Sequence, residues 1–502
     1  MTHHNQAQLF ARAAEFASRT ALIDLNGQYT YQQLLDASAG AAAGLLAGAD
    51  DLQEDRVAFL VPSGFDYVAT QWGIWRAGGI AVPLAVSHPR PELEYVITDA
   101  DAATVVVHPE FAERLRPIAQ ELDLRFILTT DLLTGAAAPL PEVDAGRRAM
   151  ILYTSGTTGK PKGVVSTHDN IQAQVTALIS AWGWTPDDHI LHVLPLHHTH
   201  GIINVLTCAL WSGAICQMLP GFKADEVWLR FIDSDLTLFM AVPTIYNRLI
   251  AAWEAASVAE KEAMAAACAR FRLMVSGSAA LPVSVLEQWE GISGQRLLER
   301  YGMTEIGMAL SNPLHGERVP GFVGSPLPTV EIRLVDDNGQ VVTVDGTPGE
   351  IQVKGPNVFL EYWRRPEATA EAFQDGWFRT GDTAVRENSI YRILGRNSVD
   401  IIKTGGYKVS ALEIEETLRT HPNIQECAVV GIADPKWGER VCVALVLKPD
   451  HQLTLEDLRD WAKERLAPYK VPADMQLVAD LPRNAMGKVT KPEVKKLFEV
   501  EN

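Results

Sequence analysis

The first 320 residues alternate short apolar, β-branched runs with Ala-rich stretches of helical periodicity. The runs are apolar at consecutive positions, which is typical of strands buried on both faces of a parallel sheet. Strands are expected at Val57–Val61, Ala103–Val107, Met150–Tyr153, His189–Leu194 and Leu273–Ser276. Helical stretches lie between them, for example at Tyr31–Gly48 and Val258–Ala269. The pattern predicts an α/β fold with parallel sheets covered by helices.

The pattern changes towards the C-terminal end of the chain. From about residue 325 to 395, short strands separated by Gly, Pro and Asp turns predict a small β-barrel-like subdomain. The polar run Gly395-Arg396-Asn397-Ser398 is expected to mark a domain boundary. Mixed helix and strand patterns follow it. We therefore expect a large N-terminal domain over residues 1–397 and a small α+β C-terminal lid domain over residues 398–502.

Composition and charge narrow the class of protein. With 47% hydrophobic and 21% charged residues, the chain is typical of globular proteins rather than disordered or fibrous ones. Its net charge of −18 argues against nucleic acid or an anionic membrane as a partner. No apolar run approaches the ~18–20 residues of a membrane span. Five cysteines without a C-x-x-C pair, and an N-terminus without signal or transit character, predict a cytoplasmic protein.

The strongest local motif follows the strand expected at Met150–Tyr153. Glycines allow tight turns that present backbone amides, while hydroxyls and lysines add donors and positive charge, a combination that suits a polyphosphate. It does not fit a Walker A loop, because no Lys-Ser or Lys-Thr pair opens a helix; a solvated turn is the alternative. The candidate phosphate-binding residues are Thr154, Ser155, Gly156, Thr157, Thr158, Gly159, Lys160 and Lys162.

Five motifs, in order along the chain, resemble those of the adenylate-forming superfamily of acyl-CoA synthetases, adenylation domains and luciferases. After the glycine-rich loop they are Tyr301-Gly302-Met303-Thr304-Glu305, Thr380-Gly381-Asp382, Gly395-Arg396 with Lys403-Thr404-Gly405-Gly406, and Pro482-Arg483-Asn484-Ala485-Met486-Gly487-Lys488. The resemblance implies an AMP-forming acid–thiol ligase. In such an enzyme a carboxylate attacks the α-phosphate of ATP, pyrophosphate leaves, and CoA then takes the acyl group.

The resemblance also assigns roles to residues. It places Asp382 on the ribose, Thr304 on the α-phosphate, Glu305 on Mg²⁺, and Lys488 between the acyl carboxylate and the α-phosphate. A carboxylate oxygen suits Mg²⁺, and a lysine is a mobile point charge. Ser398 stands where the family commonly has a charged hinge residue. The nucleotide-binding set is completed by Gly277, Ser278, Ala279, Tyr301, Gly302 and Arg396, and the CoA side by Lys403, Gly405 and Gly406.

The acyl pocket is expected near Leu194-Pro195-Leu196-His197-His198-Thr199-His200 and Arg300. An arginine beside the nucleotide motif suggests a second carboxylate on the substrate, because a guanidinium binds carboxylates bidentately. Such a site would reject monocarboxylates. These segments resemble the malonyl-CoA synthetases of the acyl-CoA synthetase family member three type. By that resemblance Arg300 and His198 are catalytic and hold substrate, in a pocket shaped by Arg248, Thr199, Ser276 and Met308.

The sequence thus predicts an ATP-dependent malonate–CoA ligase of fatty acid metabolism that uses ATP, Mg²⁺ and CoA as a monomer or homodimer. A ligase for methylmalonate or another small acid stays open, as does a structural ion pair for Arg300. A carrier-linked adenylation module is not expected, because no carrier domain adjoins. A regulatory protein without catalysis would lack Glu305 or Lys488. Zinc is not expected at His197, His198 and His200, which are too closely spaced to converge on one ion.

Overall fold

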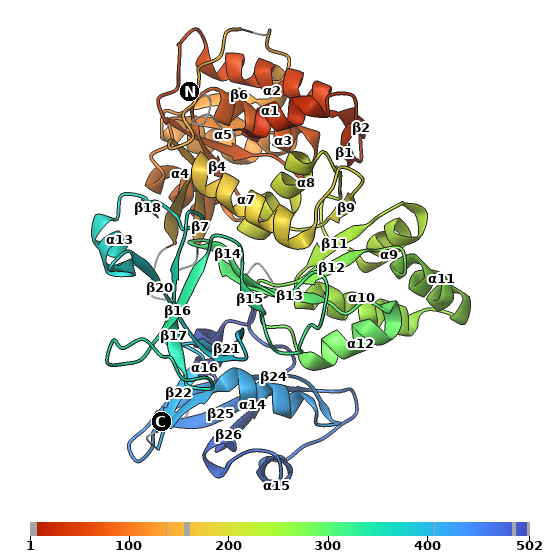
Figure 1. The fold of residues 1–502 in the computed structure, drawn as a ribbon, viewed down its shortest axis with the longest axis vertical. Helices are drawn as coiled ribbons and strands as arrows, with labels where there is room; N and C mark the ends of the chain where they lie inside the picture. The colour runs from red at the N-terminus through yellow and green to blue at the C-terminus, as the bar shows by residue number, and fades with distance from the viewer. Residues whose placement is uncertain (1–7, 137, 155–160, 406, 484–487, 499–502) are drawn as a thin grey trace.

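The fold is seen in a computed structural model, which describes residues 8–136, 138–154, 161–405, 407–483 and 488–498 (Figure 1). The large domain contains two sheets that share one hydrophobic core. The first sheet has seven strands in the order β18-β8-β7-β4-β3-β5-β6. Their bounds are β3 (Arg56–Leu60), β4 (Ile80–Pro83), β5 (Thr104–Val107), β6 (Arg125–Leu128), β7 (Arg148–Thr154), β8 (Lys162–Thr167) and β18 (Glu361–Tyr362).

Both faces of this sheet are buried, as the continuous apolar strands predict. In β3, Val57 and Phe59 belong to the main core together with side chains of α2, α3 and α7. Ala58 and Leu60 face a second core with α4 and α5. The helices near this sheet are α1 (Leu9–Glu15), α2 (Tyr31–Leu46), α3 (Phe65–Arg76), α4 (Arg90–Asp99), α5 (Ala112–Glu121), α6 (Thr129–Leu132) and α7 (His168–Trp182), with a 3-10 turn at Pro109–Phe111.

The second sheet has nine strands in the order β15-β14-β13-β12-β11-β9-β10-β1-β2. Its strands are β1 (Thr20–Asp24), β2 (Gly27–Thr30), β9 (His189–His192), β10 (Ile215–Met218), β11 (Leu238–Ala241), β12 (Leu273–Ser276), β13 (Leu298–Met303), β14 (Gly307–Ser311) and β15 (Ser325–Pro326). Its helices are a π-helix (His200–Thr207), α8 (Cys208–Ser212), α9 (Ala224–Asp233), α10 (Pro243–Ala255), α11 (Val258–Cys268) and α12 (Val283–Ser293).

The interior strands of both sheets are parallel, in agreement with the sequence pattern. The edge pairs β1–β2, β7–β8, β13–β14 and β14–β15 are instead antiparallel. The connection from β1 to β2 is only residues 25–26, which is too short for the crossover that a parallel pair needs. The expectation of parallel sheets therefore holds for the interior and not for these edges.

A third, five-stranded sheet is antiparallel throughout, with the order β16-β17-β20-β19 and β21 paired to β20. Its strands are β16 (Glu331–Val335), β17 (Gly349–Lys354), β19 (Phe373–Gln374), β20 (Trp377–Glu387) and β21 (Ile390–Arg396), with α13 (Pro366–Ala372) between β18 and β19. Leu334, Ile351 and Phe378 from this sheet join the main core. The β-rich part thus packs onto the large domain.

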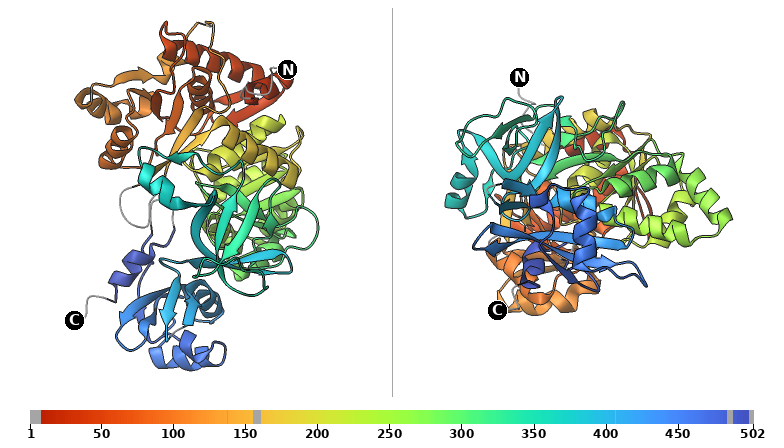
Figure 2. Two further views of the ribbon diagram at one scale, coloured as in Figure 1. Left: turned by 60° about the vertical axis from the view of Figure 1, so that its left-hand side comes forward. Right: turned by 90° about the horizontal axis from the view of Figure 1, so that it is seen from below.

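The small domain has a five-stranded sheet with separate cores on its two faces. Its elements are β22 (Ile401–Thr404), β23 (Tyr407–Ser410), α14 (Ala411–Arg419), β24 (Ile424–Asp434), β25 (Gly438–Leu447), α15 (Leu455–Lys463), a 3-10 turn (Pro468–Lys470), β26 (Asp474–Leu477) and α16 (Lys491–Lys496). Figure 2 shows this domain (blue) beside the sheet of β20 and β21. The boundary at residues 397 and 398 stays a prediction. None of the helices in the described residues is long and apolar enough to cross a membrane.

One buried ion pair fastens the starts of three neighbouring strands. Asp188, directly before β9, is 2% exposed and lies 2.6 Å (Oδ1) and 2.7 Å (Oδ2) from nitrogens of Arg272, directly before β12. Asp188 Oδ1 also accepts a 2.8 Å hydrogen bond from Thr237, directly before β11. These contacts fix the amino ends of β9, β11 and β12 relative to one another. The carboxyl ends of the same strands are thereby aligned, and loops of the predicted site begin there.

Arg272→Met is therefore expected to destabilise the large domain by about 3 kcal/mol, because it leaves the buried Asp188 carboxylate without its cation. Urea unfolding followed by tryptophan fluorescence measures the change. Lys223→Met is the control, since that lysine is 74% exposed in its pair with Glu226 and such pairs contribute less than about 1 kcal/mol. Equal stability of the two variants would contradict the structural role of Asp188 and Arg272.

Candidate functional site

The ribose-binding candidate Asp382 lies at the junction of two sheets. Tyr301 Oη, on β13, donates a 2.6 Å hydrogen bond to Asp382 Oδ2, on β20. Arg396 Nε, paired with Asp382 in the β20–β21 register, donates to Asp382 Oδ1 at 2.9 Å. Burial and the neighbouring carboxylate raise the pKa of Tyr301 well above its usual value, so the phenol keeps its proton. The structure thus brings together three residues that span 95 positions of the sequence, from Tyr301 to Arg396.

The predicted metal ligand Glu305 follows β13 and is only 6% exposed. Its Oε1 accepts a 2.9 Å hydrogen bond from Tyr362 Oη on β18. Burial raises the pKa of Glu305, and a bound cation would favour its ionised form. Lys162 Nζ, at the start of β8, lies 5.0 Å from the ring centroid of Tyr362. Tyr362 therefore connects the end of the phosphate loop to the Glu305 carboxylate.

Arg300 is a buried cation without a carboxylate partner among the described residues. Its side chain is on β13, the residue is 3% exposed, and burial lowers its pKa to about 9. Its Nε has no hydrogen-bond partner, and a Cβ at Gly277 would come within 2.4 Å of its Cζ. A side chain at position 277 would therefore displace the guanidinium. The alternative of a structural ion pair for Arg300 is thus wrong for the described part of the chain.

Lys488, from the small domain, is close to the cations of the large domain. Burial, then Arg300 and Arg396, lower its pKa to about 8. Burial and nearby positive charge also lower the pKa of His198 and His200 well below the usual range, so both rings are neutral at pH 7. An accumulation of like charges in a buried place is unfavourable unless an anion occupies it. The arrangement therefore fits a site for negatively charged substrates.

Polar atoms around Arg300 also lack partners. Ser276 Oγ, Thr199 Oγ1 and His200 Nε2 are buried and have no hydrogen-bond partner among the described residues. Ser278 Oγ lies 3.2 Å from His200 Nδ1. Buried polar groups are nearly always hydrogen-bonded. Their convergence near a buried cation indicates a pocket for a polar, anionic ligand.

The structure describes some of the other predicted site residues and leaves several of the phosphate-loop residues undescribed. Thr304 follows β13 beside Glu305, and Thr154 ends β7. Met308 is buried, and its Cε lies 2.4 Å from where a Cβ of Gly302 would stand, so Gly302 allows this approach. Ala279 is exposed at the end of the loop that follows β12. The other phosphate-loop residues Ser155, Gly156, Thr157, Thr158, Gly159 and Lys160, together with Gly406, lie outside the described residues.

The role of Arg248 as a pocket residue stays a prediction. Arg248 is exposed on α10, and its guanidinium lies 4.9 Å from the ring centroid of Phe222. The helix turns this position to solvent while Ile245 and Leu249 face the core. On the CoA side, Lys403 is exposed and Gly405 donates its amide to the Trp437 carbonyl at 2.8 Å, within the small domain.

The sequence analysis missed two residues of the site. Tyr362 is separated by 57 positions from Glu305, to which it donates its hydroxyl, and lies outside the five motifs. His200 stood in a motif but was given no role in the pocket, although its Nδ1 lies beside Ser278. The signal was the position of His200 in the segment expected near the acyl pocket, where only His198 and Thr199 were given roles. The described residues contain no cluster of three or more His, Cys, Asp or Glu side chains that could hold a metal ion.

Comparisons with known proteins agree with this geometry. The family model of the AMP-binding enzymes matches residues 9–363, and that of the AMP-binding enzyme C-terminal domain matches residues 413–488. The chain belongs to the AMP-binding enzyme family. This confirms the resemblance drawn from the five ordered motifs. The family also has the observed fold, with a large domain of mostly parallel sheets and a small C-terminal domain.

Individual relatives match nearly the whole chain. A mouse protein named malonate–CoA ligase ACSF3, mitochondrial, is 50% identical over 97% of this chain and 90% of its own length. The ATP-bound crystal structure of MatB from Rhodopseudomonas palustris is 35% identical, with a TM-score of 0.90 over 99% of both chains. The apo structure of MatB gives a lower TM-score, 0.81, over the same share. The overall structure here is thus more similar to ATP-bound MatB than to apo MatB.

Asp382→Asn is expected to weaken AMP binding about tenfold or more, because an amide accepts more weakly than the carboxylate that meets Tyr301, Arg396 and the ribose. Calorimetric titration with AMP measures the affinity. Asp345→Asn is the matched control, since Asp345 is an exposed partner of Arg386 in the same part of the chain. Unchanged AMP affinity in Asp382→Asn would remove Asp382 from the nucleotide site.

Proposed function

We propose that the protein is an ATP-dependent malonate–CoA ligase, which converts malonate, ATP and CoA into malonyl-CoA, AMP and pyrophosphate through a malonyl-adenylate. The observation that supports malonate as the substrate is the burial of Arg300. Its guanidinium lacks a carboxylate partner in the described part of the chain. A substrate with one carboxylate at the reacting phosphate and another on Arg300 would complete the site. The name of the mouse relative, malonate–CoA ligase, supports this assignment.

In the first half-reaction, an oxygen of one malonate carboxylate attacks the α-phosphorus of ATP. The bond between the α-phosphorus and the bridging oxygen breaks, and pyrophosphate leaves with the electron pair. The Lys488 ammonium neutralises the two anions that meet, and Thr304 donates to the α-phosphate. Asp382 holds the ribose. The contribution of the protein is to place these charges before the substrates arrive, so no reorganisation is needed as charge develops.

Glu305 would hold Mg²⁺ against the phosphates of ATP. One buried carboxylate, with phosphate and water oxygens as the other ligands, is a usual donor set for this ion. When bound, Mg²⁺ would supply positive charge to the departing pyrophosphate. Tyr362 orients the Glu305 carboxylate through its 2.9 Å hydrogen bond. Lys162 Nζ, 5.0 Å from the centroid of the Tyr362 ring, adds a positive charge to the same region.

The distal carboxylate of malonate would lie on Arg300. Ser276 Oγ and Thr199 Oγ1, for which the described part of the chain offers no partner, would supply hydroxyl donors to it. His198 and His200 are neutral because of burial and nearby cations, so each can donate a hydrogen bond without adding charge. A monocarboxylate would leave this buried cation unpaired, and the site discriminates against it for that reason.

In the second half-reaction, the CoA thiol attacks the malonyl carbonyl of the adenylate. The carbon–oxygen bond to AMP breaks, AMP leaves with the electron pair, and the thiol proton passes to the released phosphate or to water. Lys403, Gly405 and Gly406 remain the predicted residues on the CoA side. Ligase activity on methylmalonate, a cytoplasmic location, a role in fatty acid metabolism and a monomeric or homodimeric state also remain predictions; the name of the mouse relative includes the word mitochondrial.

A substrate panel tests the proposed function directly. CoA-dependent AMP formation is measured with malonate, methylmalonate, succinate and acetate, and malonate is expected to give the highest kcat/KM. Arg300→Met should lower kcat/KM for malonate about 100-fold or more while KM for ATP changes less than about threefold. Arg116→Met, an exposed arginine on α5 beside Phe126, is the control and should change neither. Faster turnover of acetate than malonate by the unaltered protein would refute the proposal.

The pH dependence follows from Lys488. Its lowered pKa, about 8, means that the ammonium is present below pH 8 and lost above it. The kcat/KM of malonate-dependent ATP–pyrophosphate exchange, which reports the free enzyme, should therefore decline as the pH rises through about 8. The Lys488→Arg variant should catalyse exchange more slowly. Because arginine stays charged, its kcat/KM should decline only at a higher pH, towards the pKa of Arg300, about 9. The same midpoint in both proteins would contradict the role of Lys488.

A further inference from the structure

The loop that carries Lys488 is closed at its stem but needs a connection to the rest of the protein. Thr490 N donates a 2.8 Å hydrogen bond to Pro482 O, and Arg483 pairs with Val489 as an isolated β-bridge. These contacts join one side of the loop to the other. They do not determine where the loop stands relative to the nucleotide. On one side of the stem Arg483 pairs with Glu426 on β24, and on the other side the first residue beyond the stem is Lys491.

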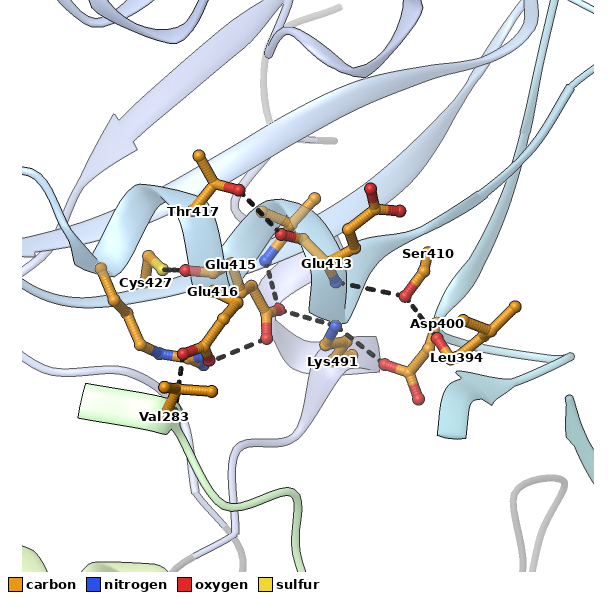
Figure 3. Close-up of polar contacts among 12 residues, drawn as sticks. Val283, Leu394, Asp400, Ser410, Glu413, Glu415, Glu416, Thr417, Cys427 and Lys491 are labelled. Atoms are coloured by element: carbon orange, nitrogen blue, oxygen red, sulfur yellow. Dashed lines mark hydrogen bonds and ion pairs between the residues drawn. The ribbon is translucent and has the colours of Figure 1, made fainter. Parts of the chain in front are cut away.

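Lys491 is the first residue of α16, and its side chain is only 10% exposed. Its Nζ lies 2.8 Å from Asp400 Oδ1 and 2.7 Å from Glu415 Oε1 (Figure 3). Burial alone would lower its pKa, but the Glu415 and Asp400 carboxylates raise it above the usual value, so Lys491 stays charged. A buried ammonium held between two carboxylates is a fixed point for the chain on either side of it.

Asp400 connects Lys491 to the predicted hinge and to the nucleotide site. While Oδ1 of Asp400 faces Lys491, its Oδ2 accepts a 3.1 Å hydrogen bond from Arg396 N, and its own amide donates to Arg396 O at 2.8 Å. The side chain of Arg396 binds Asp382. A Cβ at Gly395 would come within 2.3 Å of the Asp400 Cβ, so only glycine permits this close turn. A continuous set of contacts thus joins Asp382 to Lys491, three residues after Lys488.

Glu415 carries a second set of contacts from Lys491 to the large domain. Its Oε2 lies 3.2 Å from Arg419 Nη2, and Arg419 Nη1 lies 3.2 Å from Glu416 Oε2. Glu416 Oε1 accepts a 2.8 Å hydrogen bond from Val283 N, at the start of α12 in the large domain (Figure 3). A carboxylate at a helix N-terminus is a favourable contact. The Lys491 cluster therefore touches the large domain in the same arrangement that places Lys488 near Arg300.

We propose that Lys491 is a positioning residue of the adenylate-forming step, which holds the Lys488 loop to the hinge and so fixes Lys488 relative to the Asp382–Arg396 pair. The inference rests on the proposed function, because Lys488 must meet the α-phosphate for its position to matter. A misplacement of about 1 Å at a reacting group can lower a rate by about 100-fold. The Lys491 ammonium is held by the Asp400 and Glu415 carboxylates of the protein and is not assigned a contact with substrate or nucleotide. It acts through Lys488.

The competing explanation is that Lys491 only neutralises two buried carboxylates and stabilises the small domain. Both explanations predict a lower melting temperature for Lys491→Met, since Asp400 and Glu415 would lose their cation. They differ in whether the loss of activity passes through Lys488. A double-mutant cycle between Lys488 and Lys491 separates them, because residues that act as a unit are not additive.

The experiment measures malonate-dependent ATP–pyrophosphate exchange, at a temperature where all variants are folded, for Lys488→Ala, Lys491→Met and the double variant. We expect Lys491→Met to lower kcat about 30-fold with KM for ATP changed less than about threefold. In the Lys488→Ala background the same substitution should change kcat less than about twofold. Lys491→Arg, which keeps the charge, should recover kcat to within about fivefold of the unaltered protein. Lys496→Met, in an exposed pair with Glu493 on the same helix, should have no effect.

Two results would overturn the inference. One is an equal fold loss from Lys491→Met in both backgrounds, which is the signature of a purely structural lysine. The other is a Lys491→Met enzyme as active as Lys496→Met. The unaltered protein distinguishes these failures from a failure of the proposed function, because absence of malonate-dependent exchange there would refute the ligase assignment itself. Exchange in the unaltered protein with either result above would refute only the role of Lys491.

Discussion

The structure depends on the gathering of positive charge in a place from which water is largely excluded. Burial, followed by the nearby charges of Arg300 and Arg396, lowers the pKa of Lys488 to about 8, and burial lowers the pKa of Arg300 to about 9. Burying like charges close together is costly, and the fold tolerates this because the substrates are anions. Binding of those anions therefore removes a cost that the folded protein already carries.

Each of the two domains contributes part of this group of charged residues. The large domain fixes Arg300 on β13 behind the small residue Gly277, and it holds Asp382 through Tyr301 and Arg396. The small domain supplies Lys488. Charges placed beforehand stabilise a transition state more than charges that must be oriented during the reaction. An arrangement of this kind needs the domains to meet in a defined orientation, which the overall similarity to ATP-bound MatB reflects.

Much of the fold followed from the apolar pattern. Strand β12 has the bounds that the pattern predicted, Leu273–Ser276, because a buried parallel strand is apolar at every position. The antiparallel edges were missed, since pairing direction depends on the length of a connection and not on the hydrophobicity of a strand. Arg248 was assigned to the pocket by resemblance, and only the structure shows that helix periodicity exposes its side chain.

By itself the sequence determined the family, the order of the motifs and the kinds of chemical group available, because these depend on residue types at short spacing. It could not determine which groups meet. Tyr362 donates to Glu305 across 57 positions, and Lys491 reaches Asp400 across 91. The net charge of −18 gave no indication of the cationic site, since it describes mainly the surface. Only the tertiary structure decided the burial of Arg300 away from any described carboxylate, because burial and distance result from the packing of whole elements.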